Sequence, residues 1–200
     1  MLNFASLLMH LNCCTVQRRT NTYMCVIISV LPSKTLLVTA HTASVMKLSV
    51  LTHQITHRRG SSNSTERYFC DFLVNGHSLL EMLDKLSGSN SGSKDGQPSD
   101  LIGSFVVGYP EHNQQKRDQL LLAAQPDTES GRIMLYICPE CGDLGCGAYT
   151  VRVEKTGNHY TWHDFAYENG YEPPHLIADT AFTFDAAAYE QAMQDMTLIR

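Results

Sequence analysis

Hydrophobic positions become regularly spaced only from residue 66 onward. Residues 67–74 (RYFCDFLV) are rich in aromatic and branched side chains and predict a strand, which the turn pair Asn75-Gly76 ends. Ser78 stands three residues before Glu81, the spacing of a capping box, and apolar residues then follow at helical intervals up to Leu86. This region therefore predicts a strand, a tight turn and a short helix.

Three further strand-like segments predict an antiparallel meander, over residues 133–138, 146–154 and 159–165. The first hairpin pairs Ile133 with Val151, and a two-residue turn at Thr156-Gly157 then pairs Val151 with Trp162. This register gathers one apolar face, which consists of Ile133, Leu135, Ile137, Tyr149, Val151, Val153, Tyr160 and Trp162. We expect that face to be buried.

The remaining elements lie around this meander. They are a short strand over residues 101–107, a helix over 111–124 that ends before Pro126, a strand over 182–184 and a helix over 186–196. Asp185 is expected to be the N-cap of the last helix. The packing side of that helix consists of Tyr189, Ala192, Met193 and Met196.

Charge divides the chain into two parts. Residues 1–65 contain no Asp or Glu and six Lys or Arg, whereas the other 135 residues hold all 20 acidic and nine basic side chains, a balance of −11. We therefore expect residues 1–45 to be an unstructured or mis-assigned N-terminal extension. Residues 46–200 are expected to form a single α+β domain, an antiparallel β-meander with a few peripheral helices.

Three interpretations of the N-terminal part compete. A secretory signal would begin with basic residues, but Arg18 and Arg19 follow the first apolar stretch. A transit peptide fits the scarcity of acids, although the amphipathic spacing of Arg is missing. Met46 opens a segment, MKLSVL, that is typical of an ordinary protein start, and we favour a translation start there.

Composition argues against two classes of partner. The mean hydropathy is −0.19, and no apolar run reaches the ~18 residues of a membrane helix. A net charge of −5 disfavours nucleic-acid binding, which needs a basic surface. We expect no membrane or nucleic-acid partner and a cytoplasmic location, while a protein partner stays open.

The strongest chemical signal is the segment CPECGDLGCG, residues 138–147, which we call the Cys loop. Pro139 stiffens its first turn and Gly142 tolerates a positive φ, so that backbone N–H groups can point at thiolate sulfur, as in a metal knuckle. Cys138, Cys141 and Cys146 thus offer three sulfur atoms from one small loop. We expect these three residues to bind a metal, with zinc as the cofactor.

Zinc takes four ligands, and the chain has no second C-x-x-C. The predicted register brings Glu168 beside Cys146. It places His163 roughly 13 Å from Cys146, at ~3.3 Å per residue, which is the wrong end of the strand. The candidates that stay open for the fourth position are Glu168, Asp143, His175, Cys70 and a water molecule.

The same cysteines allow other interpretations. Cys138 and Cys146 could form a cross-strand disulfide in an oxidising compartment. The Cys138/Cys141 pair could be a redox dithiol, although such motifs usually stand at a helix N-terminus and Gly142 disfavours a helix here. A third interpretation is that the three cysteines of the Cys loop are reduced thiols with a purely structural role. Cys70, which aromatic residues flank, is expected in the core.

The Cys loop with the following alanine resembles the core, CPECGDLGCGA, of a family of small uncharacterised bacterial proteins. The resemblance extends to Phe72-Leu73-Val74-Asn75-Gly76, Trp162-x-Asp164-Phe165 and Phe182-x-Phe184-Asp185, covering residues 46–195 and leaving 1–45 unmatched. Members of this family are sometimes loosely labelled oxidoreductases. The resemblance implies little chemistry, because it carries no nucleotide-binding fingerprint.

Three functional hypotheses follow, and the choice between enzyme and non-enzyme stays open with a preference for the latter. The sequence contains no G-x-S-x-G, no G-x-x-x-x-G-K-[ST] and no G-x-G-x-x-G motif. The first hypothesis is a metal-stabilised binding or regulatory module. The second is a dithiol oxidoreductase that uses Cys138 and Cys141. A third, an accessory protein such as an inhibitor, draws only on the acidic balance of the domain.

Overall fold

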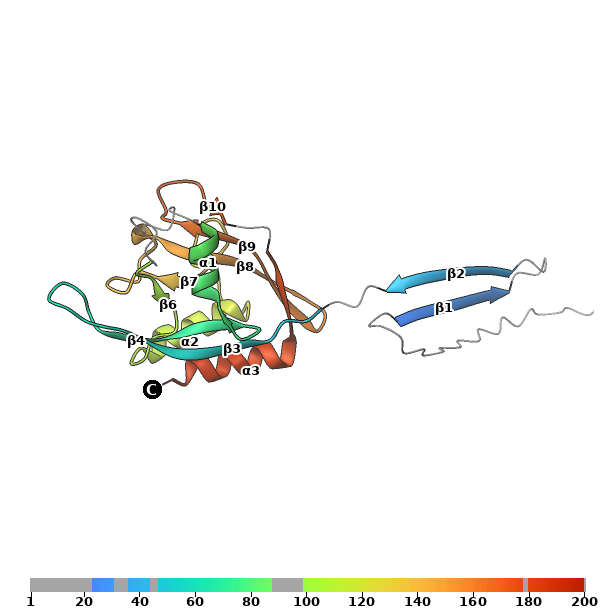
Figure 1. Cartoon of the computed structure of the whole chain (residues 1–200), viewed down its shortest axis with the longest axis horizontal. Coiled ribbons are helices and arrows are strands. Elements are labelled where there is room, and N and C mark those ends of the chain that lie inside the picture. Colours follow the sequence, from blue (N-terminus) through green and yellow to red (C-terminus); the bar gives the residue numbers. More distant parts are fainter. Residues whose placement is uncertain (1–22, 31–35, 44–46, 88–98, 178–179, 200) are drawn as a thin grey trace, which may run out of the picture. The chain divides into compact units, whose positions relative to one another are not determined.

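The computed structural model describes residues 23–30, 36–43, 47–87, 99–177 and 180–199 (Figure 1). The chain divides into two compact units, Met1–Lys47 and Leu48–Arg200. In the first unit, β1 (Tyr23–Val30) pairs antiparallel with β2 (Leu36–Ala43). The sequence predicted no regular element here, because these residues show no sustained period of two. The other residues of the expected extension lie outside the described part.

The described part of the second unit contains three α-helices and two sheets. Its elements are β3 (Leu51–Arg58), β4 (Arg67–Val74), β5 (His77–Ser78), α1 (Leu79–Ser87), β6 (Ile102–Gly103), α2 (Pro110–Leu120), β7 (Ile133–Ile137), the 3₁₀ turn η3 (Leu144–Cys146), β8 (Ala148–Thr156), β9 (His159–Glu168), β10 (His175–Leu176), β11 (Phe182–Asp185) and α3 (Ala186–Thr197). The sheets are antiparallel, so the expected α+β class is confirmed. Among the described residues, no helix has the length and apolar character needed to cross a membrane.

Backbone hydrogen bonds link the edges of the two sheets of this unit, so that the strands form a closed ring. One sheet has the order β3-β4-β5 and the other β10-β9-β8-β7-β6, with β11 also paired to β9. Cys70 N donates to Phe105 O over 2.8 Å, which links β4 to the segment after β6. Ser49 N donates to Thr183 O over 2.7 Å, which links the start of β3 to β11. The main core consists of side chains from these strands and from the three helices.

The meander forms as expected, but its second hairpin has a different register. Ile133 pairs with Val151, as predicted. Trp162, however, pairs with Val153 rather than Val151, because the turn lies at Gly157-Asn158 and Thr156 is already paired with His159. The shift of two residues leaves the sidedness of β9 unchanged, since side chains alternate with a period of two. Trp162 is therefore buried as expected.

A bulge between Met134 and Tyr136 changes which side chains β7 buries. Tyr136 enters the main core, whereas Ile137 packs in a second, smaller cluster. That cluster also contains Phe69, Ile102 and Val106. The predicted apolar face is otherwise buried, apart from Val153, which is partly exposed.

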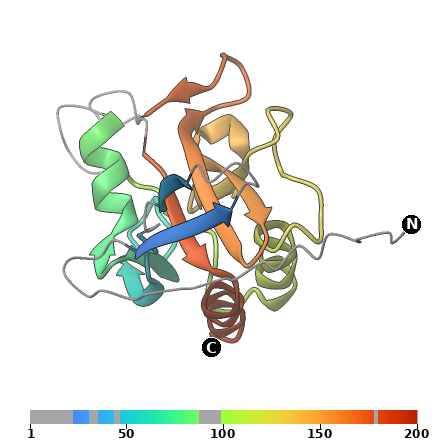
Figure 2. The ribbon, with the colours of Figure 1, turned by 90° about the vertical axis from the view of Figure 1, so that its right-hand side faces the viewer.

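The helices confirm most of the local signals. Ser78 Oγ accepts from Glu81 N at the start of α1, and Asp185 accepts from Ala188 N at the start of α3. The residues predicted for the packing side of α3 are buried. α2 ends at Leu120, earlier than expected. Figure 2 shows α2 and α3 side by side, and Tyr189 Oη donates to Leu120 O there.

Candidate metal centre

The Cys loop connects β7 to β8, and its backbone folds tightly upon itself. Gly142 N donates to Cys138 O over 2.9 Å, and Gly142 has a φ of +66°, a conformation that glycine adopts without a Cβ penalty. Asp143 then caps η3, since its Oδ1 accepts from Gly145 N over 2.6 Å. These local bonds place Cys146, the last residue of η3, beside the C-x-x-C pair.

The three predicted ligands lie together. The sulfur atoms of Cys138, Cys141 and Cys146 are within 4.8 Å of one another, and those of Cys141 and Cys146 are 3.3 Å apart. Tetrahedral zinc with Zn–S bonds of about 2.3 Å separates its sulfur ligands by roughly 3.8 Å. The Cys141–Cys146 separation is about half an ångström shorter than this value and no pair is more than 4.8 Å apart, so the three cysteines are close enough to hold a metal ion.

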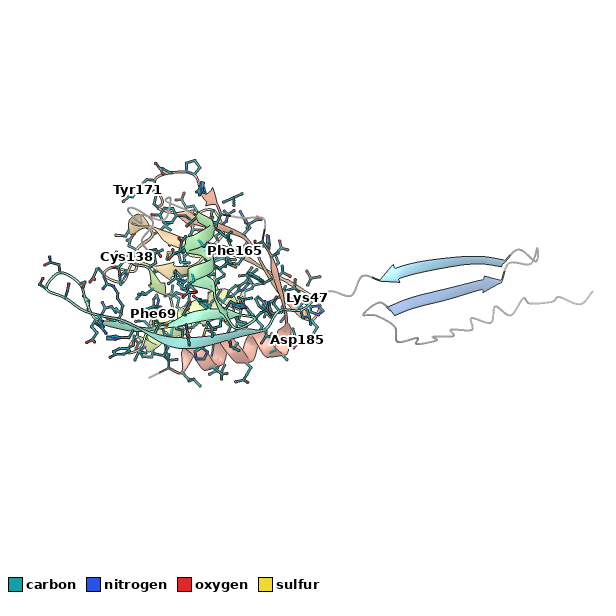
Figure 3. The ribbon with its side chains drawn as sticks, viewed as in Figure 1. Lys47, Phe69, Cys138, Phe165, Tyr171 and Asp185 are labelled. Atoms are coloured by element: carbon teal, nitrogen blue, oxygen red, sulfur yellow. The ribbon has the colours of Figure 1, made fainter. Side chains whose placement is uncertain are left out.

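The strands predicted over residues 133–138 and 146–154 were each too long at the end that meets the Cys loop. β7 ends at Ile137 and β8 begins at Ala148, so both cysteines lie in the connection rather than in the strands. All four cysteines that the structure describes in the second unit have free thiols. Cys138 is partly buried, whereas Cys141 and Cys146 are exposed. The cluster is thus held at the surface of the unit, at the same end as Tyr171 (Figure 3).

Backbone N–H groups point at the sulfur atoms, as expected for a metal knuckle. Asp143 N donates to Cys141 Sγ over 3.4 Å. Partial burial acts to raise the pKa of the Cys138 thiol, but hydrogen bonds from the backbone of Cys141 and Glu140 outweigh it, so that the pKa is lowered. The pKa of Cys146 is raised to about 11, chiefly by its hydrogen bonds with Cys141 and Cys138. One thiolate is therefore favoured within the cluster.

None of the four expected side chains joins the cluster as a fourth ligand. Glu168 pairs with Ala148 rather than lying beside Cys146, and its Oε1 accepts from Thr150 and Ser130 over 2.8 Å each. Glu168 is thus engaged by these two hydroxyl groups inside the unit, where it is buried. The predicted register was wrong here, because the turn of the second hairpin lies further along the chain and Glu168 is paired two residues beyond Cys146.

The other three candidate side chains do not belong to the cluster either. Asp143 is engaged as the cap of η3. Cys70 lies in the core, as predicted, and burial raises its pKa to about 12. His175 stands in β10, exposed and outside the cluster. Among the described residues, the group contains only the three cysteines, so its outer side is open to a water molecule or another exogenous ligand.

Sequence reasoning missed the side chains that hold the loop from outside. Thr65 Oγ1 and Arg58 Nη1 donate to the Glu140 carboxylate over 2.6 and 2.8 Å, and Thr65 N donates as well. These bonds, those from Thr65 first, lower the pKa of Glu140 to about 2. Arg67 Nε donates to Pro139 O over 3.0 Å. In the sequence, the only sign of these contacts was that an acidic residue, Glu140, lies between Cys138 and Cys141.

Two tyrosines lie against the other half of the loop. Gly147 has a φ of +93°, and a Cβ there would overlap Tyr167 Oη. A Cβ on Gly145 would lie 2.9 Å from Tyr171 Oη. Burial, followed by the nearby Cys146, raises the pKa of Tyr167. The glycines of the loop therefore serve close packing as well as turn geometry.

Comparison with protein-family models, with curated proteins and with solved structures yields no match.

Proposed function

We propose that residues 48–200 form a zinc-stabilised binding or regulatory module, with Cys138, Cys141 and Cys146 as the protein ligands. The observation that carries this proposal is the convergence of three sulfur atoms within 4.8 Å on one short loop. Thiolates are soft ligands and select zinc among the common divalent ions by ligand type and tetrahedral geometry. The fourth position belongs to water or to a group from a partner.

The proposed role of the metal is to fix the connection between two core strands. Metal binding to thiolates contributes directly to the free energy of folding, because the unfolded chain has no preformed site. The loop begins one residue after Ile137, and Ile137 is buried in the second cluster. A bound ion would therefore restrain the end of β7 and the start of β8 together. A reducing compartment such as the cytoplasm keeps the thiols available.

The test is elemental analysis of the full chain, purified without added metal. We expect about one equivalent of zinc for each chain and loss of that zinc in the Cys141→Ser variant. Cys25→Ser, which removes a cysteine from the other unit, is the matched control and should retain the metal. Chelation should lower the thermal unfolding midpoint, and added zinc should restore it. Metal-free protein that melts identically with and without chelator would refute the proposal.

A second candidate is a dithiol oxidoreductase that uses Cys138 and Cys141. The lowered pKa of Cys138 supports it, since a thiolate is the attacking species in thiol–disulfide exchange. The loop continues into a 3₁₀ turn of three residues, η3, rather than an α-helix whose dipole would stabilise the thiolate. We therefore place this candidate after the metal-binding module.

A further inference from the structure

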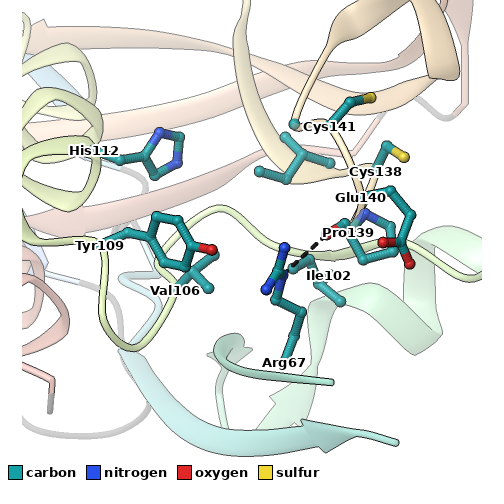
Figure 4. A pocket seen from close by; sticks show the side chains of 11 residues that line it. Arg67, Ile102, Val106, Tyr109, His112, Cys138, Pro139, Glu140 and Cys141 are labelled. Carbon is teal, nitrogen blue, oxygen red and sulfur yellow. Dashed lines mark hydrogen bonds between the residues drawn. The ribbon is translucent and has the colours of Figure 1, made fainter. Parts of the chain in front are cut away.

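A pocket of about 200 Å³ lies on the side of the Cys loop that faces β4, β6 and the start of α2. Segment 138–142 forms one wall, and Ile102, Val106 and Ile137 form the apolar floor. Arg67, Tyr109 and His112 complete the lining (Figure 4). Figure 4 also shows the sulfur atoms of Cys138 and Cys141 directed away from His112, although both residues belong to the lining.

Arg67 supplies a positive charge, and only part of its hydrogen-bonding capacity is satisfied by the described residues. Its Nε donates to Pro139 O over 3.0 Å, and its guanidinium lies 5.5 Å from the centroid of the Tyr109 ring. These two contacts orient the guanidinium group. The two terminal nitrogens have no hydrogen-bond partner among the described residues. A guanidinium in this state is suited to paired hydrogen bonds with a carboxylate.

His112 adds a neutral polar group at the other end of the pocket. Its Nε2 lies 2.9 Å from Ser104 O, and a carbonyl only accepts, so this nitrogen carries the proton. Burial, and then the positive charge of Lys116, lower the pKa of His112. The ring is therefore neutral at neutral pH, and its Nδ1 is an acceptor.

Glu140 is the acidic residue of the lining, and it is already engaged. Its carboxylate accepts from Arg58 and Thr65, as described above. Arg58 in turn also donates to Asp100. Glu140 thus does not neutralise Arg67, and no ion pair of Arg67 occurs among the described residues.

We propose that this pocket binds a small organic carboxylate with an apolar body of about the size of one ring. The carboxylate would pair with Arg67, and the apolar body would contact Ile102, Val106 and Ile137. The size follows from the volume, because an apolar cavity of ~150 Å³ accommodates benzene. The available 200 Å³ therefore accepts a ring with one small polar group. This binding goes beyond the proposed metal-binding function, and none of its proposed contacts involves a cysteine.

Benzoate and benzamide are suitable probes, because they share shape and differ in charge. Binding to the full chain as purified, at pH 7, can be followed by titration with ligand-observed NMR. We expect benzoate to bind and benzamide to bind at least about tenfold more weakly, since it cannot form the charge-assisted bonds. Nuclear Overhauser effects from the benzoate ring to the Tyr109 and His112 rings should locate it.

Arg67→Gln should weaken benzoate binding at least about tenfold, whereas Arg59→Gln, the same change at an exposed arginine outside the pocket, should leave it unchanged. The comparison of the two probes needs no substitution, so the proposal can be tested even if Arg67→Gln fails to fold. Equal binding of both probes, benzoate binding unaffected by Arg67→Gln, or no benzoate binding at millimolar concentration would each overturn it. Because the metal content of the same samples is measured separately, failure here is distinguishable from failure of the metal proposal.

Discussion

Arg58 Nη1 donates to Glu140 Oε1 over 2.8 Å, which connects the last residue of β3 to the residue between the first two cysteines. The two residues are 82 positions apart in the chain. Glu140 is exposed, and yet its pKa is lowered to about 2 by Thr65 and Arg58. The tertiary fold thus controls the protonation of a residue within the Cys loop.

This relationship predicts a specific pH dependence. The folded-state pKa of Glu140 lies below its ordinary value of 4.5, so its contribution to stability is complete above pH 4.5 and is lost as the pH falls toward 2. Glu140→Gln removes the charge and should lower the unfolding midpoint at pH 7 while making its decline between pH 4.5 and 2 shallower. Thermal unfolding followed by circular dichroism at stepped pH measures this.

Glu129→Gln is the control, because Glu129 is exposed and has no hydrogen bond or ion pair in the described part of the chain. It should reproduce the wild-type pH profile. If Glu140→Gln also reproduces it, the carboxylate does not stabilise the loop.

The cysteines should differ in reactivity once metal is removed. The pKa of Cys138 is lowered and that of Cys146 is raised to about 11, so at pH 7.5 Cys138 contains more thiolate. We expect iodoacetamide to modify Cys138 before Cys146 in chelated protein, as measured by peptide mass spectrometry over time. Zinc should slow the modification of all three cysteines. The reverse order, or rates that zinc leaves unchanged, would contradict this reading of the cluster.

Gly103 is predicted to be intolerant of any side chain. A Cβ there would overlap the carbonyl oxygen of Cys70, where β6 crosses β4. Gly103→Ala should therefore cost at least about 2 kcal/mol in the free energy of unfolding, measured by urea denaturation. Gly76→Ala is the comparison, because Gly76 has a φ of +82° but nothing within 4 Å of the added Cβ. Its cost should be about 1 kcal/mol, from backbone strain alone. Equal losses in the two variants would show that β6 can move away.

The buried hydroxyl of Tyr189 should be important for stability. It accepts from Trp162 Nε1 over 2.9 Å and donates to Leu120 O over 3.1 Å. Tyr189→Phe leaves a buried donor and a buried acceptor unpaired, which costs about 1–3 kcal/mol. Trp162 is the single tryptophan of the chain, so its fluorescence reports the unfolding transition directly. Tyr171→Phe, at a residue 83% exposed, should be neutral; a similar loss in both variants would argue against the buried bonds.

The candidate site was predictable because its geometry is local. Three cysteines within nine residues, with Gly142 at a positive φ, bring their sulfur atoms together largely through bonds inside the loop itself. The cap of α3 at Asp185 was equally local. The register of β9 was not, because both Thr156-Gly157 and Gly157-Asn158 are acceptable turn pairs and only packing of the whole strand selects between them.

The amino-acid sequence by itself determined the α+β class, the meander and the convergence of Cys138, Cys141 and Cys146, since turn residues and periodic apolar positions act over a few residues. The tertiary structure alone decided the bulge in β7 and the closing of the strands into a ring. It also decided the hydrogen bonds by which Arg58 and Arg67 hold the Cys loop. In the folded chain the carboxylate of Glu168 is buried and accepts a hydrogen bond from Thr150, so it is not a ligand of the cluster. Such contacts join residues far apart in the chain, and their energies exist only when the strands have assembled.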